Sequence, residues 1–349
     1  MKAVRQASVL LFLCGALQIL HGQNDNLKRE IEKIIRYEAY IDFNVVPGVM
    51  VGVIDGSNTY INSFGEQLDP DSIYELGGLT KPVVAWLVDQ ALDSLGWNHD
   101  VNVCTFLPDS LCQGNYLSLT IDQVINYRSG LPRIPNIHSE SKEPNDGLYA
   151  DYTFEHLSRD ITTMKPNPGN YGYSNVAYAM LYWLFEKVGG LESYATQKLF
   201  KPYNLNKTGW NFPDEKIAQG HNIGGLPVSP WHASAMATSL GLKSSMDEMM
   251  IILEMISPKL IQATPPLTKS LKKELKALYK ADEYKVIDGW FLIKSGKDLL
   301  YYKTGRTGGH QVTVAFMPQK RKGVIVFSNG TLGSNNLSLL VLDMINRAK

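Results

Sequence analysis

The sequence predicts an α+β fold, in which one antiparallel sheet is formed from both ends of the chain and flanked by helices, beside a mostly helical subdomain. Three observations support this prediction. Strand-like segments occur near both ends, helix and loop patterns fill the middle, and residues 82–95 form a helix too apolar for the surface. We therefore expect residues 82–95 to be a central helix, with Pro82 in its first turn.

The first elements after the N-terminal region are a helix and a hairpin. Residues 24–41 carry isoleucines at helical spacing and predict an amphipathic helix. Residues 48–54 (GVMVGVI) are typical of a strand, and residues 59–64 of a second strand that returns after an Asp-Gly-Ser-Asn turn. Together, the two strands predict a β-hairpin.

The central part of the chain is predicted to be helix and loop. Residues 120–127 indicate a short helix capped by Thr120, and residues 175–188 a helix that ends at a Gly-Gly pair. Between them, residues 133–168 are rich in Pro, Asn, Ser and Asp. This composition predicts a long loop that could act as a lid.

The last third of the chain returns to strands after one more helix. Residues 246–255 predict that helix, capped by Ser244 or Ser245. Residues 335–347 predict an amphipathic helix that closes the chain. Four segments between them alternate or run apolar and predict strands: residues 289–294, 299–303, 311–317 and 323–327.

The charge balance argues against a nucleic-acid partner. The 349 residues include 34 Lys plus Arg and 34 Asp plus Glu, so the formal net charge is zero. Nucleic-acid binders normally carry a basic surplus. The most basic segment, residues 269–276, is interrupted by Glu274 and is interpreted as a solvated helix face.

The N-terminal segment has the features of an export signal. Lys2 and Arg5 precede an apolar stretch, and Gly22 offers a small residue for cleavage. We therefore expect a signal peptide at residues 1–22 and one domain at residues 23–349, secreted or periplasmic and without a membrane span. An uncleaved anchor is the alternative, although the apolar run is short for a bilayer.

Cysteine use fits an exported protein. Cys14 lies in the predicted signal peptide, which leaves Cys104 and Cys112. These two could pair in an oxidising compartment, or they could be two separate buried thiols. Without histidines at ligand spacing they make a poor zinc site. We expect no metal and no cofactor.

Three separated segments carry the chemistry. They are residues 76–81 (LGGLTK), 171–175 (YGYSN) and 303–309 (KTGRTGG). In order and spacing they resemble the S-x-x-K, Y-x-N and K-T-G elements of the serine β-lactamase and penicillin-binding-protein superfamily, especially its class C, D-alanyl-D-alanine carboxypeptidase and esterase branch. Residues 126–132 (NYRSGLP) and 241–249 (GLKSSMDEM) resemble two further segments of that branch.

The resemblance implies a fold and a set of roles. The fold would be that of β-lactamases and transpeptidases. Lys81 would accept a proton beside the nucleophile, and Tyr173 would pass a proton to the leaving group. Asn175 would hold Lys81 and a substrate amide. The backbone N–H groups of residue 78 and Arg306 would form an oxyanion hole.

The K-T-G segment would contact the substrate. Lys303 would supply positive charge for a substrate carboxylate or for the tyrosine, and Thr304, Gly305 and Arg306 would bind the substrate beside it. The resemblance therefore implies a small-molecule or peptide ligand with acyl or carboxylate groups. His310 follows this segment and could line the cleft or be an ordinary strand residue.

Each of these residues also has a purely structural interpretation. Lys81 could be a surface lysine, although its neighbours are apolar. Tyr173 and Asn175 could be loop and cap residues, and residues 303–305 could be no more than a strand end. The shared order of the segments favours the site.

The sequence departs from the family at one decisive position. Three residues before Lys81, where the nucleophilic serine would stand, the chain has Gly78. Glycine has no side chain, so no acyl-enzyme can form there. The nearest hydroxyl is on Thr80, which helical geometry turns away by about 100° per residue.

Three hypotheses follow. The chain could be a binding or regulatory pseudoenzyme that uses the old cleft. It could be an enzyme that uses Lys81 and Tyr173 for proton transfer without a covalent intermediate. It could also be a hydrolase of esters, D-amino-acid peptides or β-lactams whose serine was removed by engineering or by a sequence error. We expect ordinary acyl-enzyme hydrolysis to be absent as long as Gly78 is present.

Overall fold

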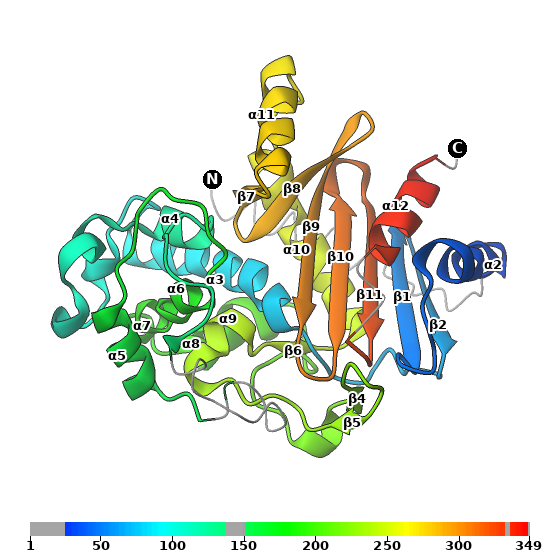
Figure 1. Ribbon diagram of the computed structural model, residues 1–349, viewed down its shortest axis with the longest axis horizontal. Helices are drawn as coiled ribbons and strands as arrows, with labels where there is room; N and C mark the ends of the chain where they lie inside the picture. Colours follow the sequence, from blue (N-terminus) through cyan, green and yellow to red (C-terminus); the bar gives the residue numbers. More distant parts are fainter. Residues whose placement is uncertain (1–24, 137–148, 150, 332–335, 348–349) are drawn as a thin grey trace.

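Both ends of the chain meet in one central sheet, as predicted (Figure 1). Its seven strands run in the order β2-β1-β11-β10-β9-β8-β7, and every neighbouring pair is antiparallel. In this sheet Val49 lies opposite Ser328. The strands are β1 (Gly48–Asp55), β2 (Asn58–Gly65), β7 (Lys285–Ile287), β8 (Trp290–Ser295), β9 (Asp298–Arg306), β10 (Gln311–Met317) and β11 (Lys322–Ser328).

The computed structural model describes residues 25–136, 149, 151–331 and 336–347. The predicted signal peptide, residues 1–22, lies outside them, and so does most of the centre of the predicted lid, residues 137–148 and 150.

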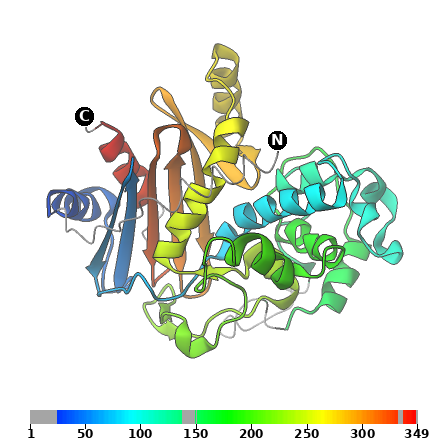
Figure 2. The ribbon, with the colours of Figure 1, turned by 180° about the vertical axis from the view of Figure 1, so that it is seen from behind.

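Helices cover both faces of the sheet. On one face lie α2 (Asp25–Ile34) and α12 (Leu337–Arg347). On the other face lies α10 (Met246–Ala263), which Figure 2 shows crossing the sheet. Successive residues of β1 accordingly face opposite sides of the sheet: Met50 and Ile54 belong to one apolar core, and Val49, Val51 and Val53 belong to the other. This double cover explains why the strand is an unbroken apolar run.

A helical subdomain packs beside the sheet and contains the predicted central helix. That helix, α3 (Thr80–Leu95), buries residues around most of its circumference and ends at Gly96, whose φ of 68° is the left-handed conformation that favours glycine. The other helices of the subdomain are α4 (Ile121–Ile125), α5 (Phe154–Thr163), α6 (Asn175–Ala179), α7 (Leu181–Glu186), α8 (Leu191–Ala195) and α9 (Ala237–Leu240).

Two short strand pairs and one further helix lie outside the sheet and the helical subdomain. The pair β3 (Tyr74–Glu75) and β6 (Lys243–Ser244) lies just before the start of α3, and β4 (Gly220–His221) pairs with β5 (Pro227–Val228). Helix α11 (Lys269–Lys280) is the predicted basic helix, and it projects beyond β7 and β8 (Figure 1).

Some predicted elements differ from the structure. The predicted loop at 133–168 contains α5, whose N-terminus has a capping box between Thr153 and His156. The predicted helix at 175–188 is divided into α6 and α7 at Met180. Helix α10 continues past Pro258, well beyond its predicted end, and is capped by Ser245.

The two cysteines outside the predicted signal peptide form a disulfide. Cys104 and Cys112 are joined with their Cα atoms 5.3 Å apart. The bond closes a loop of short 3₁₀ turns between α3 and α4. Of the two alternatives left open by the sequence, the structure therefore has the paired one.

Candidate active site

The site begins at the first turn of α3. Gly77–Leu79 form a 3₁₀ turn that runs directly into the helix. Gly78 and Lys81 are three residues apart, a spacing that brings them to one helical face. The hydroxyl of Thr80 is buried and accepts a hydrogen bond from the Leu242 N–H at 3.1 Å. This hydrogen bond ties the Thr80 hydroxyl to the backbone segment that follows α9 (Ala237–Leu240).

Lys81 lies fully buried beneath the cleft. Its ammonium nitrogen contacts the Tyr173 hydroxyl at 2.9 Å, Asn175 Oδ1 at 2.7 Å and the Ser239 carbonyl oxygen at 3.0 Å. Burial lowers the pKa of Lys81 well below its usual value, and the nearby charge of Lys303 lowers it further. A neutral amine can donate to the two carbonyl oxygens while its lone pair faces the tyrosine hydroxyl. This arrangement can accept a proton.

Tyr173 occupies the centre of the site. Desolvation raises the pKa of its hydroxyl, and the Arg133 guanidinium, 5.1 Å from the ring centroid, opposes that rise. A Cβ atom added to Gly78 would lie only 2.6 Å from the Tyr173 hydroxyl oxygen and 3.2 Å from the Thr304 carbonyl oxygen. The tyrosine hydroxyl thus takes the space that a side chain at residue 78 would need.

Lys303 projects from β9 into a group of aromatic rings. Its ammonium lies 4.6 Å from the Tyr127 ring centroid, 4.7 Å from that of Tyr173 and 4.5 Å from that of Phe291. It also donates a hydrogen bond to the Tyr127 hydroxyl. Burial lowers the pKa of Lys303 well below its usual value, and Arg133 lowers it further.

The remaining residues of the K-T-G segment lie against the start of α3. A Cβ atom at Gly305 would lie 3.0 Å from the Gly78 amide nitrogen and 2.8 Å from that of Leu79. A glycine at 305 is therefore what allows β9 to approach the helix so closely. This approach brings Thr304 and Arg306 beside Gly78, as the motif spacing implies.

These residues surround one cleft of about 730 Å³. Three of the lining residues are basic (Arg133, Lys303 and Arg306), and one, Asp282, is acidic. The predicted residues that line the cleft are Gly78, Tyr173, Asn175, Lys303, Thr304, Gly305 and Arg306. The cleft can thus hold a ligand of small-molecule or short-peptide size, and its charge favours a carboxylate.

Sequence reasoning missed two residues of the site. Arg133 lines the cleft and faces the Tyr173 ring, and Tyr127 bonds to Lys303. Both lie within or directly after the matched segment at residues 126–132, which was the available signal. That segment placed them near the site, but it could not show which way their side chains point.

His310 does not line the cleft. It is buried, and its Nδ1 lies 3.0 Å from Glu75 Oε2. Burial alone would raise the pKa of Glu75, but hydrogen bonds from His310, the Trp231 N–H and Thr307 lower it below its usual value. This buried pair links β3 to the residue just before β10 (Gln311–Met317), so His310 neither lines the cleft nor belongs to the strand itself.

One group of potential metal ligands occurs among the described residues, away from the cleft. Ligand atoms of Asp89, His99 and Asp288 lie within 4.8 Å of one another. The ammonium of Lys259 contacts both carboxylates. This lysine already supplies the positive charge that the carboxylates need, so the group is best explained as an ion pair that connects α3 to α10.

The fold and the site together have a buried lysine, Lys81, in the first turn of the central helix, beside a tyrosine hydroxyl and beneath a cationic cleft. The β-lactamase family model matches residues 37–339, and the chain belongs to the β-lactamase family.

Solved structures of class C β-lactamases share the fold. One, from Rhodobacter sphaeroides, has a TM-score of 0.68 at 18% identity and covers 91% of this chain and 97% of its own. Another, in complex with cefoxitin, has a TM-score of 0.72 at 17% identity, with 92% and 99% covered. A β-lactamase/D-alanine carboxypeptidase from Pseudomonas syringae has a TM-score of 0.70 at 17% identity, with 93% and 98% covered.

A curated relative is similar over part of its length. It is the unguisins hydrolase ungD' of Aspergillus campestris, which is 22% identical over 222 residues. The match covers 56% of this chain and 40% of the relative, so the chain spans less than half the length of that protein.

Proposed function

We propose that this chain is a binding pseudoenzyme of the β-lactamase family, which holds a ligand in the cleft without capturing it covalently. The observation that carries the proposal is Gly78 at the nucleophile position, with the Tyr173 hydroxyl in the adjoining space. Removing the serine nucleophile of an unrelated protease lowers turnover on the order of a millionfold. Ordinary hydrolysis through an acyl-enzyme would therefore fall to background.

The proposed ligand is an acylated amino acid, a peptide or another compound with a carboxylate. Arg133 and Arg306 line the cleft and stay charged at any physiological pH. Lys303 lies among the rings of Tyr127, Tyr173 and Phe291, and its lowered pKa favours the neutral amine, which can gain a proton. An anionic group placed here would restore that charge and form charge-assisted hydrogen bonds.

We also propose that the protein is exported. The apolar stretch after Lys2 and Arg5 supports this, and so does the Cys104–Cys112 disulfide, a bond typical of oxidising compartments. Within the part of the chain that the structure describes, no helix has both the length and the apolar character to cross a bilayer.

The binding proposal is tested by separating covalent capture from reversible binding. The protein is incubated with benzylpenicillin or a fluorophosphonate and its intact mass is measured, and binding of a panel of N-acyl peptides with free carboxylates is measured by calorimetry. We expect no adduct, together with reversible binding that weakens at least tenfold in Arg133→Ala. Arg128→Ala is the matched control, because Arg128 is exposed in the same loop and lies outside the cleft lining. An adduct mapped to the cleft would overturn the proposal.

A second candidate function is non-covalent acid–base catalysis. The contact of 2.9 Å between Lys81 and the Tyr173 hydroxyl favours it, because a neutral lysine beside a hydroxyl can activate water. If the protein hydrolyses an activated ester slowly, Lys81→Met should abolish that activity while the circular dichroism spectrum stays unchanged. Unchanged turnover in Lys81→Met would eliminate this candidate.

A further inference from the structure

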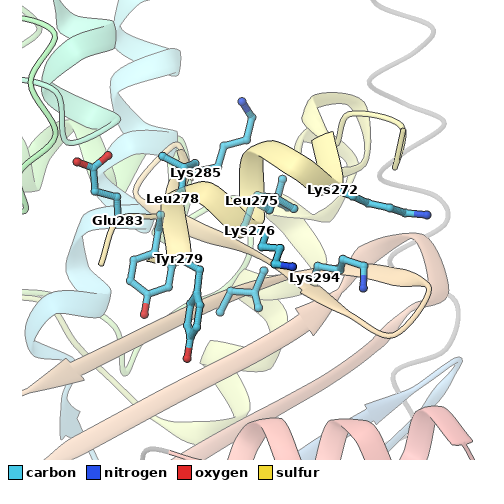
Figure 3. Close-up of a pocket in the computed structure, with 11 residues that line it drawn as sticks. Lys272, Leu275, Lys276, Leu278, Tyr279, Glu283, Lys285 and Lys294 are labelled. Carbon is cyan, nitrogen blue, oxygen red and sulfur yellow. The ribbon is translucent and has the colours of Figure 1, made fainter. Parts of the chain in front are cut away.

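A second cavity of about 580 Å³ lies between α11 and the β7–β8 edge of the sheet (Figure 3). Its volume falls within the range of ordinary small-molecule sites. It is separate from the cleft, although Tyr284 lines both. The lining residues are Lys272, Leu275, Lys276, Leu278, Tyr279, Glu283, Tyr284, Lys285, Leu292, Ile293 and Lys294.

The cavity has an apolar floor that the protein itself does not cover. Leu292 of β8 is buried at its base, whereas Leu275 and Leu278 of α11 are only half-buried. Among the residues of α11, Leu271 alone is buried, and Tyr279 is 73% exposed. An amphipathic helix normally buries its apolar face. Here that face is turned toward an open pocket.

The two ends of the cavity differ in charge. The side chains of Lys272, Lys276 and Lys294 gather toward one end, whereas Glu283 and Tyr279 lie toward the other (Figure 3). Among the described residues, no carboxylate lies within ion-pair distance of these three lysines. The fourth lysine of the lining, Lys285, is paired with Glu274 at 2.8 Å.

We propose that this cavity binds a free anionic amphiphile with a single hydrocarbon chain, such as a fatty acid. The carboxylate lies among Lys272, Lys276 and Lys294, and the hydrocarbon chain covers the leucines of α11 and β8. The charge difference between the two ends fixes the orientation of the ligand. The lysine stems add apolar contact along its first carbons, since such side chains bury their methylene groups and keep the ammonium in water.

The test measures binding of monomeric dodecanoate by calorimetry, with dodecanol as the uncharged probe. We expect dodecanoate to bind and dodecanol to bind at least tenfold more weakly. Lys276→Glu/Lys294→Glu should weaken dodecanoate binding at least tenfold. Lys273→Glu/Lys297→Glu is the matched control, because these exposed lysines lie on the same helix and in the β8–β9 turn but do not line the cavity. The control should change the dissociation constant less than twofold.

The cleft is also cationic, so the two sites must be distinguished. Lys303→Met, which changes a residue of the cleft lining and none of the cavity lining, should leave dodecanoate binding within twofold, and Leu278→Ser should weaken it. Loss of binding in Lys303→Met would assign the ligand to the cleft and overturn the proposal. Failure of dodecanoate to bind the wild-type protein would also overturn it. So would binding only to anionic vesicles or to an acidic peptide, because either result would make α11 a docking surface and not a fatty-acid site.

Discussion

At the scale of single residues, the cleft is shaped by the space between Gly78 and the Tyr173 hydroxyl. The hydroxyl is held by Lys81 and lies where a Cβ at residue 78 would contact it. A serine introduced at residue 78 must therefore displace the tyrosine oxygen. Overpacking of this kind destabilises a folded protein by about 1 kcal/mol or somewhat more.

Gly78→Ser should accordingly lower the free energy of unfolding by about 1 kcal/mol, and the loss should shrink when Tyr173→Phe removes the conflicting oxygen. A double-mutant cycle measured by urea denaturation checks this coupling. Strictly additive effects would show that the two positions do not compete for space.

Gly78→Ser should also gain a slowly forming fluorophosphonate adduct, because Lys81 and the surrounding backbone are in place to support a new nucleophile. Intact-mass measurement over time checks this. Rapid, complete labelling would favour a chain that lost only its serine, as the engineering or sequence-error hypothesis requires. No labelling of a correctly folded variant would contradict our expectation.

The buried lysines make stability depend on pH. The pKa of Lys81 lies well below its usual 10.5 in the folded protein, so the unfolded chain binds more protons between those two values. The free energy of unfolding should therefore rise between pH 8 and pH 10. Lys81→Met should reduce the rise of the unfolding free energy with pH. Lys303 should account for part of the rise that remains in this variant. Urea denaturation at several pH values tests the sign, and an unchanged slope in Lys81→Met would contradict it.

At the scale of elements, the Cys104–Cys112 disulfide fixes the connection between α3 and α4. Closing a loop of this size stabilises a protein by roughly 2 kcal/mol through its effect on the unfolded chain. Cys104→Ser/Cys112→Ser should lower the free energy of unfolding by about that amount, and reducing agent should destabilise the wild type but not the variant. Equal sensitivity of both proteins to reducing agent would show that the bond is not formed.

The elements that the sequence predicted well are those with a strong apolar pattern. Strand β1 and helix α3 are apolar over most of their length because the structure covers them on several sides. Helix α5 was missed because His156, and not Glu or Gln, completes its capping box within a polar stretch. Strand β7 was missed because it is short and only half-buried.

The site was predictable to the extent that it depends on local motifs. Three separated segments identified Lys81, Tyr173 and the K-T-G strand, and the fold brings them together at the cleft. Arg133 could not be assigned in the same way, because its contact with the Tyr173 ring joins two segments that are 40 residues apart in the sequence and depends on the tertiary fold. Local patterns do not carry that information.

At the scale of the whole molecule, ligand binding should be coupled to proton uptake. Lys303 has a lowered pKa in the free protein, and a carboxylate beside it would raise that pKa again. Binding of a carboxylate ligand should therefore take up protons from solution at pH values above the pKa of Lys303 in the free protein and below its usual 10.5. Calorimetry in buffers of different ionisation enthalpy measures the number of protons, and Lys303→Met should reduce it. Binding with no dependence on the buffer would contradict this prediction.

The order of the central sheet also has a consequence for biosynthesis. The β1–β2 hairpin is made early on the ribosome, whereas β11, which covers one edge of β1, is made near the end of translation. Until then the hairpin presents unpaired backbone groups and valine-rich faces, which are features that promote aggregation. Completion of the sheet must wait for the last strands to emerge, so stalled or shortened chains are the forms most in need of a chaperone.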